Sequence, residues 1–311
     1  MKKQRIVYMG TPIFAKEVLE TIVDNGYDVV GVVTQPDKPV GRKKEIVFSP
    51  VKKYALENNL KCIQPDTIKA GYQQILDLNP EIIITCAYGQ IVPDILLNYP
   101  KYGCLNIHAS LLPRLRGGAP IHKAIIYGED RTGVSIMRMV KKMDAGDYCM
   151  QRSVSIDIDD TAATLHDKLI NLSQQMILEC LPLAFRNELV FIKQDESKVT
   201  FAFNISKEEE YVSFNRDYMT VYNHIRGLIT WPLGYGLIDG EKVKFHEVKV
   251  SDIITNEANG TVLGMVEGSL GVAVDKRVML FPSIQLAGKK AMSALEFVNG
   301  HGHKYISKRF D

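Results

Sequence analysis

The sequence predicts an α/β protein in which a doubly wound, mostly parallel sheet precedes a small antiparallel β-barrel. Over about the first 186 residues, short β-branched runs alternate with amphipathic helical patterns, which is typical of a parallel sheet covered on both faces. After residue 206 the pattern changes to short strands separated by Gly and Asp turns, which is typical of a small barrel. A chain of 311 residues is long enough for both domains.

The first half divides into alternating strands and helices. Residues 5–10 (RIVYMG) are expected to form a buried strand, and residues 14–26 a helix with Val18, Leu19 and Ile22 on one face. Further strands are expected at 28–34, 61–64, 81–89, 103–110 and from 132, and helices at 49–59, 72–78 and 161–185.

The second half begins with a less regular segment. Residues 187–206 are interpreted as a linker that contains an edge strand, which predicts a catalytic domain over 1–188, a linker over 189–206 and a barrel over 207–311. The barrel should contain a helix at 217–228 and strands within 234–250, 259–274 and 276–286.

The turn after the first strand, MGTPIFA, carries a helix-start signal. Thr11 is expected to cap the helix and Pro12 to occupy its first position. The turn lacks the G-x-G-x-x-G fingerprint of dinucleotide-binding proteins. Local capping explains most of this motif, and anion binding at the helix N-terminus is the alternative.

Composition indicates an ordinary globular protein with no strong overall field. The formal net charge is +2, so any nucleic-acid site must be local. The five cysteines are scattered without a C-x-x-C pair, which favours a reducing compartment over disulfides or zinc. The N-terminus lacks a signal-peptide apolar segment and no 18-residue apolar run follows, so we expect a cytoplasmic protein.

Asn106 and His108 are the first candidates for chemistry. They lie on the same face of the strand expected at 103–110, about 6.6 Å apart, and at its carboxyl end, where open α/β sheets bind ligands. Asn can donate to a developing oxyanion, and His can transfer a proton or stabilise the oxyanion when charged. The alternative is a pair of core polar residues with satisfied partners.

Asp144 is the third candidate. It begins the sequence D-A-G, in which an Asp is commonly only a turn former. If Asp144 reaches His108, it would favour the imidazolium and fix its orientation. Asn, His and Asp without a Ser or Cys nucleophile in an obvious motif suit direct transfer to an amine.

The motifs NIHASLLPRLRGGAP and MDAGD resemble those of the 10-formyl-tetrahydrofolate-dependent formyltransferases. Most of the chain resembles the branch that formylates methionyl-tRNA, in MGTPIFA, VVTQPDKPVGRKK, AYGQIVP, LHDKL, IRGLITWPLGYGLIDG and QLAGKKAMSALEFVNGH. Ile13 departs from the acidic residue usual in that branch, and the residues around Trp231 are usually richer in proline. The resemblance implies a Rossmann-like catalytic domain and an OB-like C-terminal domain.

The resemblance also implies roles for the matched residues. Asn106 and His108 would stabilise the tetrahedral adduct, while Asp144 tunes the His and orders a proton-relaying water. The co-substrate 10-formyl-tetrahydrofolate would contact Ser110, Leu111, Leu112 and Pro113, and its pterin ring the backbone of Gly89, Gln90, Ile91 and Val92. No metal is implied.

A basic loop follows the second expected strand. Residues 37–53 hold six Lys or Arg against two acidic residues, and Pro39 and Gly41 predict no stable regular structure in the free loop. A generic solvated loop is one interpretation, although long loops beside a site are more often functional. The resemblance implies that this loop binds initiator methionyl-tRNA through Lys38, Arg42, Lys43 and Lys44, and that Lys289 and Lys290 form a second contact.

These expectations combine into formyl transfer from 10-formyl-tetrahydrofolate to the amino group of methionyl-tRNA by a monomer. The nearest competing function is the same chemistry on a small amine, such as glycinamide ribonucleotide or an amino sugar. The basic loop and the barrel argue against it. Two further functions remain open, an RNA-binding protein with a degenerate enzyme domain and a formyl-folate hydrolase.

Overall fold

The structure is a computed structural model of the chain, and it describes residues 3–40, 45–300 and 302–311. The chain forms two compact units. Unit 1 contains Met1–Pro120, Thr132–Val154 and His166–Phe203. Unit 2 contains Ile121–Arg131, Ser155–Leu165 and Asn204–Asp311. The first two segments of unit 2 lie within the sequence range of the expected catalytic domain, and no composition change marks them.

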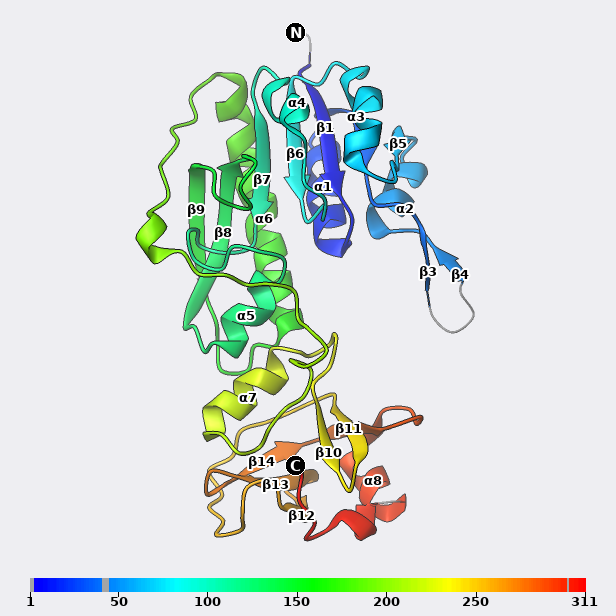
Figure 1. Cartoon of the computed structure of the whole chain (residues 1–311), viewed down its shortest axis with the longest axis vertical. Helices are drawn as coiled ribbons and strands as arrows, with labels where there is room; N and C mark the ends of the chain where they lie inside the picture. The colour runs from blue at the N-terminus through cyan, green and yellow to red at the C-terminus, as the bar shows by residue number, and fades with distance from the viewer. Residues whose placement is uncertain (1–2, 41–44, 301) are drawn as a thin grey trace. The chain divides into compact units, whose positions relative to one another are not determined.

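A seven-stranded sheet forms the centre of unit 1 (Figure 1). The first five strands across the sheet are parallel neighbours, whereas β7 pairs with β8 in the antiparallel direction. The predicted doubly wound, mostly parallel sheet is therefore confirmed. In spatial order the strands are β5 (Cys62–Ile63), β2 (Asp28–Val33), β1 (Arg5–Gly10), β6 (Ile82–Cys86), β7 (Cys104–His108), β8 (Arg131–Arg138) and β9 (Tyr148–Ser155).

Helices cover both faces of this sheet, because the side chains of each strand alternate between the faces. Val7 and Met9 share a core with residues of α3 (Ile68–Leu76) and α4 (Asp94–Asn98). Behind the sheet in Figure 1 lie α1 (Ile13–Asp24) and α6 (Ala162–Phe185), which Gln174 Nε2 joins by donating to Glu17 O at 3.2 Å. Contacts with α1 also fix α2 (Pro50–Glu57), which Ser49 caps.

The start of α1 differs from the expectation that Thr11 caps it. The N-cap is Pro12, with no side-chain cap bond. The Thr11 hydroxyl instead donates to Tyr88 O at 3.4 Å and accepts from Gln35 N at 3.3 Å. The capping prediction was wrong because this hydroxyl joins the chain segments that follow β2 and β6.

The basic loop contains regular structure that its sequence did not predict. Strands β3 (Lys38–Val40) and β4 (Glu45–Val47) pair in the antiparallel direction, with Lys38 opposite Val47. Ile46 and Val47 are β-branched residues, which favour extended backbone. This tendency outweighed the turn signals in the loop, and residues 41–44 lie outside the described residues.

The predicted edge strand in the segment after α6 is also wrong. The structure describes residues 187–206 throughout and assigns them only a short 3-10 helix, Glu196–Lys198, and isolated bridges. Ile192 pairs with Tyr148, and Phe201 pairs with Arg116. Side-chain contacts replace a continuous ladder here, so residues 187–203 follow unit 1 as an irregular segment.

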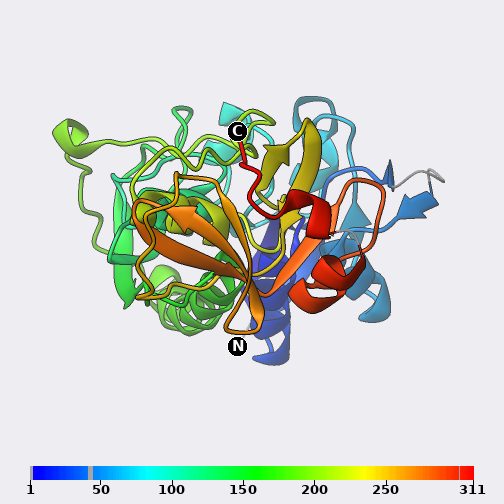
Figure 2. The same cartoon turned by 90° about the horizontal axis from the view of Figure 1, so that it is seen from below.

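Unit 2 consists of two antiparallel sheets around one core, which confirms the predicted antiparallel C-terminal strands. Phe214, Phe245, Phe281 and Phe310 meet in this core with ring centroids 4.8–6.1 Å apart. Figure 2 shows its three-stranded sheet, in orange, and α8, in red. The elements are α5 (Pro120–Ile126), α7 (Tyr218–Arg226), α8 (Ala294–Gly300), the sheet of β10 (Tyr235–Ile238), β11 (Glu241–Phe245), β15 (Ser283–Leu286) and β16 (Met292–Ser293), and the sheet of β12 (Val262–Val266), β13 (Ser269–Val274) and β14 (Arg277–Phe281).

Candidate active site

Strand β7 carries Asn106 between two hydrogen-bonded neighbours. Thr85 of β6 and Met137 of β8 lie opposite Asn106 in the sheet. The Thr85 hydroxyl donates to Asn106 Oδ1 at 2.8 Å. Because the amide oxygen accepts this bond, the amide nitrogen is the group that Asn106 can offer to an oxyanion.

His108 ends β7 and is buried, with 6% of its surface exposed. Its Nε2 lies 3.0 Å from Leu115 O. A carbonyl oxygen only accepts, so Nε2 carries a hydrogen and donates it. The other ring nitrogen, Nδ1, lies 3.8 Å from Asp144 Oδ2. Nδ1 therefore faces the carboxylate of Asp144.

Asp144 is held by the backbone of the loop after β7. Its Oδ2 accepts from Gly117 N at 2.9 Å. Gly117 has φ +126°, and a Cβ there would lie 2.6 Å from Ala202 O. Only glycine fits this position, so Gly117 of the basic glycine motif is required for the approach to Asp144.

The segment Ser110–Pro113, expected to contact folate, is fixed by side chains of β8 and β9. Ser135 Oγ donates to Ser110 O at 2.6 Å and accepts from Leu112 N at 3.1 Å. Gln151 Nε2 donates to Leu112 O at 2.7 Å. Leu112 is buried, whereas Leu111 and Pro113 are half-buried.

The segment Gly89–Val92, expected to contact the pterin, follows β6. Gly89 has φ +83° and is exposed. The Gln90 side chain accepts from Ile68 N at 2.7 Å and donates to Gln35 Oε1 at 3.2 Å. Ile91 is 81% exposed, whereas Val92 is buried against α3 and α4. Because β6 and β7 are parallel neighbours, this segment and Ser110–Pro113 begin at the same edge of the sheet.

The residues expected to bind tRNA fall in both units. In unit 1, Lys38 is exposed at the start of β3, and Arg42, Lys43 and Lys44 lie outside the described residues. In unit 2, Lys289 and Lys290 are exposed after β15.

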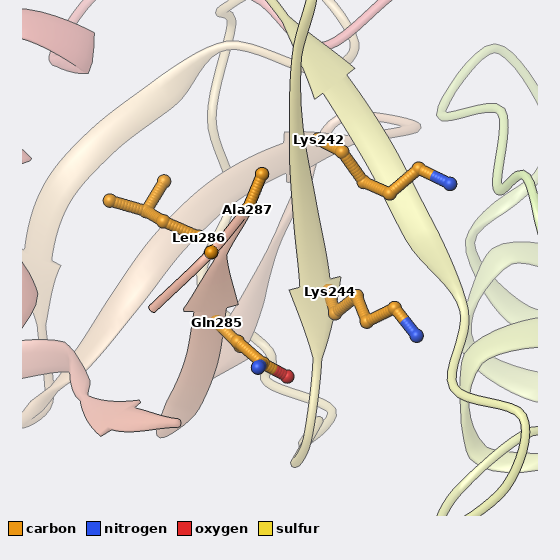
Figure 3. Close-up of a pocket in the computed structure, with 6 residues that line it drawn as sticks. Lys242, Lys244, Gln285, Leu286 and Ala287 are labelled. Carbon is orange, nitrogen blue, oxygen red and sulfur yellow. The ribbon is translucent and has the colours of Figure 1, made fainter. Parts of the chain in front are cut away.

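A small pocket in unit 2 adds two lysines that the sequence analysis did not identify (Figure 3). It is lined by Lys242, Lys244 and Gln285 together with residues 286–288. The two lysines extend to the same side of β11, and neither forms a salt bridge with another described residue. Their alternation in EKVKF was the available signal, since side chains two apart share a face of a strand.

Further site-forming residues were also missed, because their partners lie far away in sequence. Gln194 Nε2 donates to Asp144 O at 2.8 Å, and Thr200 Oγ1 accepts from Leu115 N at 2.9 Å. Both belong to the segment that the sequence pattern indicated to be a linker. Thr85 and Ser135 had no distinguishing motif.

Neither a metal centre nor a membrane span is found among the residues that the structure describes. Within them, no cluster of three or more His, Cys, Asp or Glu side chains could hold a metal ion. No helix in the described ranges is both long and apolar enough to span a membrane.

The chain matches the formyl transferases over most of its length. The formyl transferase family matches residues 4–181, and the C-terminal domain of formyl transferases matches residues 204–302. The methionyl-tRNA formyltransferases of Malacoplasma penetrans and Bacillus licheniformis are each 44% identical to this chain, over 96% of its length and 94% and 95% of theirs. The chain therefore belongs to the formyl transferase family and, within it, to the methionyl-tRNA formyltransferases.

Solved structures share this fold at low sequence identity. The methionyl-tRNA formyltransferase of Clostridium thermocellum has a TM-score of 0.57 and 18% identity, over 80% of this chain and 94% of that one. HypX from Aquifex aeolicus in complex with tetrahydrofolic acid has a TM-score of 0.70 and 15% identity over 96% of this chain. The chain spans about half the length of HypX.

Proposed function

We propose that this protein transfers the formyl group of 10-formyl-tetrahydrofolate to the amino group of methionine esterified to initiator tRNA. The observation that carries the proposal is the placement of Asn106 and His108 at the carboxyl end of β7, with His108 Nδ1 3.8 Å from Asp144 Oδ2. The 44% identity to methionyl-tRNA formyltransferases over nearly the full length of the chain supports the choice of substrate.

The reaction needs a stabilised oxyanion and a proton exchange. The methionyl amine attacks the formyl carbon and forms a C–N bond, while the carbonyl electrons move to oxygen. Asn106 Nδ2 and His108 stabilise this oxyanion. Collapse breaks the bond to the folate N10, which gains one proton while the amine loses one. No net acid or base is consumed.

The remaining residues divide between the two substrates. We assign folate contacts to Gly89–Val92 and Ser110–Pro113, which begin at the sheet edge that holds the catalytic set. We assign tRNA contacts to the basic loop, Lys38 and Arg42–Lys44, and to Lys289 and Lys290. Lys242 and Lys244 are further candidates in unit 2, because lysines that share a strand face and form no salt bridge within the described residues suit phosphates.

Domain roles, assembly and location complete the proposal. The catalytic domain extends over residues 1–188 and the tRNA-binding domain over 207–311, joined by residues 189–206. The protein acts as a cytoplasmic monomer without an obligate protein partner.

The test is an assay for the product. The protein is incubated with 10-formyl-tetrahydrofolate and either methionyl initiator tRNA, glycinamide ribonucleotide or an amino sugar nucleotide. Formyl-methionine in the tRNA reaction alone supports the proposal. Formylation of a small amine alone would favour a small-amine formyltransferase, and release of formate in every reaction would indicate a hydrolase.

A further inference from the structure

Gln194 lies in the irregular segment after α6 and is 4% exposed. Its amide nitrogen donates to two backbone carbonyls of one turn, Asp144 O at 2.8 Å and Gly146 O at 2.6 Å. Its amide oxygen accepts two bonds from Arg116, from Nε at 3.1 Å and from Nη2 at 2.8 Å. One buried amide thus connects the residue before Gly117 to the turn that bears Asp144.

Arg116 is fully buried, which is unusual for a guanidinium. Its Nη2 also lies 2.7 Å from Glu196 Oε1, while Nη1 has no hydrogen-bond partner among the described residues. Arg116 and Lys142 lower the pKa of Glu196 to about 2, Arg116 making the larger contribution. The rigid fork of an Arg presents two parallel donors and fixes the plane of the amide it contacts.

The turn that Gln194 holds has a constrained shape. Asp144 has φ +48°, which is in the left-handed region. A Cβ at Gly146 would lie 1.8 Å from Arg138 O, so the chain approaches β8 closely there. Such a turn keeps one conformation only where its surroundings fix it. The carboxylate it presents lies 3.8 Å from His108 Nδ1.

We propose that Gln194 and Arg116 are positioning residues that hold Asp144 against His108 for formyl transfer. Neither needs to touch a substrate. Arg116 orients the Gln194 amide, and the amide fixes the two carbonyls that flank Ala145. The inference rests on the proposed function, because it concerns the same catalytic set.

The experiment uses Gln194→Glu in the full-length protein. A carboxylate keeps the size of the side chain and its pairing with Arg116, but it cannot donate to the carbonyls of Asp144 and Gly146. We expect kcat for methionyl-tRNA to fall about 10- to 100-fold, since a misplacement of about 1 Å can cost 100-fold, with KM for both substrates within about threefold. The matched control is Gln174→Glu, which removes a similar amide–carbonyl bond between α6 and α1 and should keep the parent kcat.

A double-mutant cycle with Asp144→Asn separates positioning from a general structural role. If Gln194 acts through Asp144, Gln194→Glu lowers kcat in the parent and has little further effect in the Asp144→Asn protein. Equal losses in both backgrounds, or an unchanged kcat in the parent, would overturn the proposal. Arg116→Lys enters the same cycle with the same expectation should Gln194→Glu fail to fold.

A readout without substrate keeps this inference separate from the proposed function. The Gly117 amide donates to Asp144 Oδ2, so we expect its hydrogen exchange to be faster in Gln194→Glu than in Gln174→Glu. Equal hydrogen-exchange rates of the Gly117 amide in the two variants would contradict the role proposed for Gln194, even in an active enzyme. Absence of formyl-methionine with the parent protein would instead contradict the proposed function.

Discussion

At the scale of single residues, the site depends on fixed hydrogen-bond directions. The Thr85 hydroxyl donates to Asn106 Oδ1, which leaves the amide nitrogen of Asn106 to present to an oxyanion. His108 donates from Nε2 to Leu115 O, and its Nδ1 faces Asp144. Groups that are oriented before the reaction stabilise an oxyanion without reorganising. This arrangement explains why polar side chains occupy an otherwise apolar strand.

Asn106→Ala should lower kcat for formyl transfer about 100- to 1000-fold, the usual cost of losing one oxyanion donor. The dissociation constant for the folate should change little, because the donor acts on the charged intermediate. Steady-state kinetics and a folate titration measure the two effects. A kcat within a few-fold of the parent would remove Asn106 from its assigned role.

At the scale of elements, the sequence patterns predicted strands β1, β2 and β5 to β8 and helices α1, α2, α3 and α6, whereas α4, β9 and the irregular segments were not predicted. Periodicity predicted α1 and α6 because each buries one apolar face, and continuous apolar runs predicted the parallel strands because these are buried on both faces. The hydrogen bonds of Gln194 could not be predicted, since its partners lie 48 to 78 positions away in the sequence. The hairpin of β3 and β4 was not predicted, because Pro39 and Gly41 of the loop suggested irregular backbone.

The hairpin leads to a prediction about RNA binding. Arg42→Ala should weaken the use of methionyl-tRNA and leave folate binding intact, because a guanidinium can bridge phosphate and base edges. The salt dependence of tRNA binding should fall by about one unit of slope per lost phosphate contact. Kinetics with whole tRNA at two salt concentrations would show this. Unchanged kinetics and an unchanged salt dependence would show that the loop does not bind tRNA.

Helix α7 contains the buried His224, whose pKa predicts how folding stability depends on pH. Burial lowers the pKa of His224, and the charge of Arg216 lowers it further, although the bond to Glu209 O opposes both. An unfolded His titrates near about 6.5, so below that pH the unfolded state binds the proton first. The contribution of neutral His224 to the free energy of unfolding is therefore fully present above this pH, and it is lost as the pH falls toward the pKa of His224 in the folded state.

The expected result is a melting temperature that falls between pH 7.5 and pH 5.5 more steeply in the parent than in His224→Gln. Thermal unfolding followed by circular dichroism measures the difference. His303→Gln is the control, because His303 is exposed. Identical slopes for the parent and His224→Gln would show that this buried His does not couple folding to pH.

At the scale of the whole molecule, charge is local rather than global. The net charge is only +2, yet residues 37–53, which extend from β3 into α2, carry an excess of four positive charges. The lysines of β11 and of the turn after β15 add basic groups in unit 2. A protein that binds one large anionic substrate needs such patches without a strong overall field.

The residues at the end of β7 are proposed to transfer a formyl group to methionyl-tRNA. This proposal is tested most directly by single-turnover formylation, with enzyme in excess over methionyl initiator tRNA and with saturating 10-formyl-tetrahydrofolate. We expect rapid formation of formyl-methionyl-tRNA by the parent protein and a rate at least about 100-fold lower for His108→Ala. Equal single-turnover rates for the two proteins would contradict this proposal.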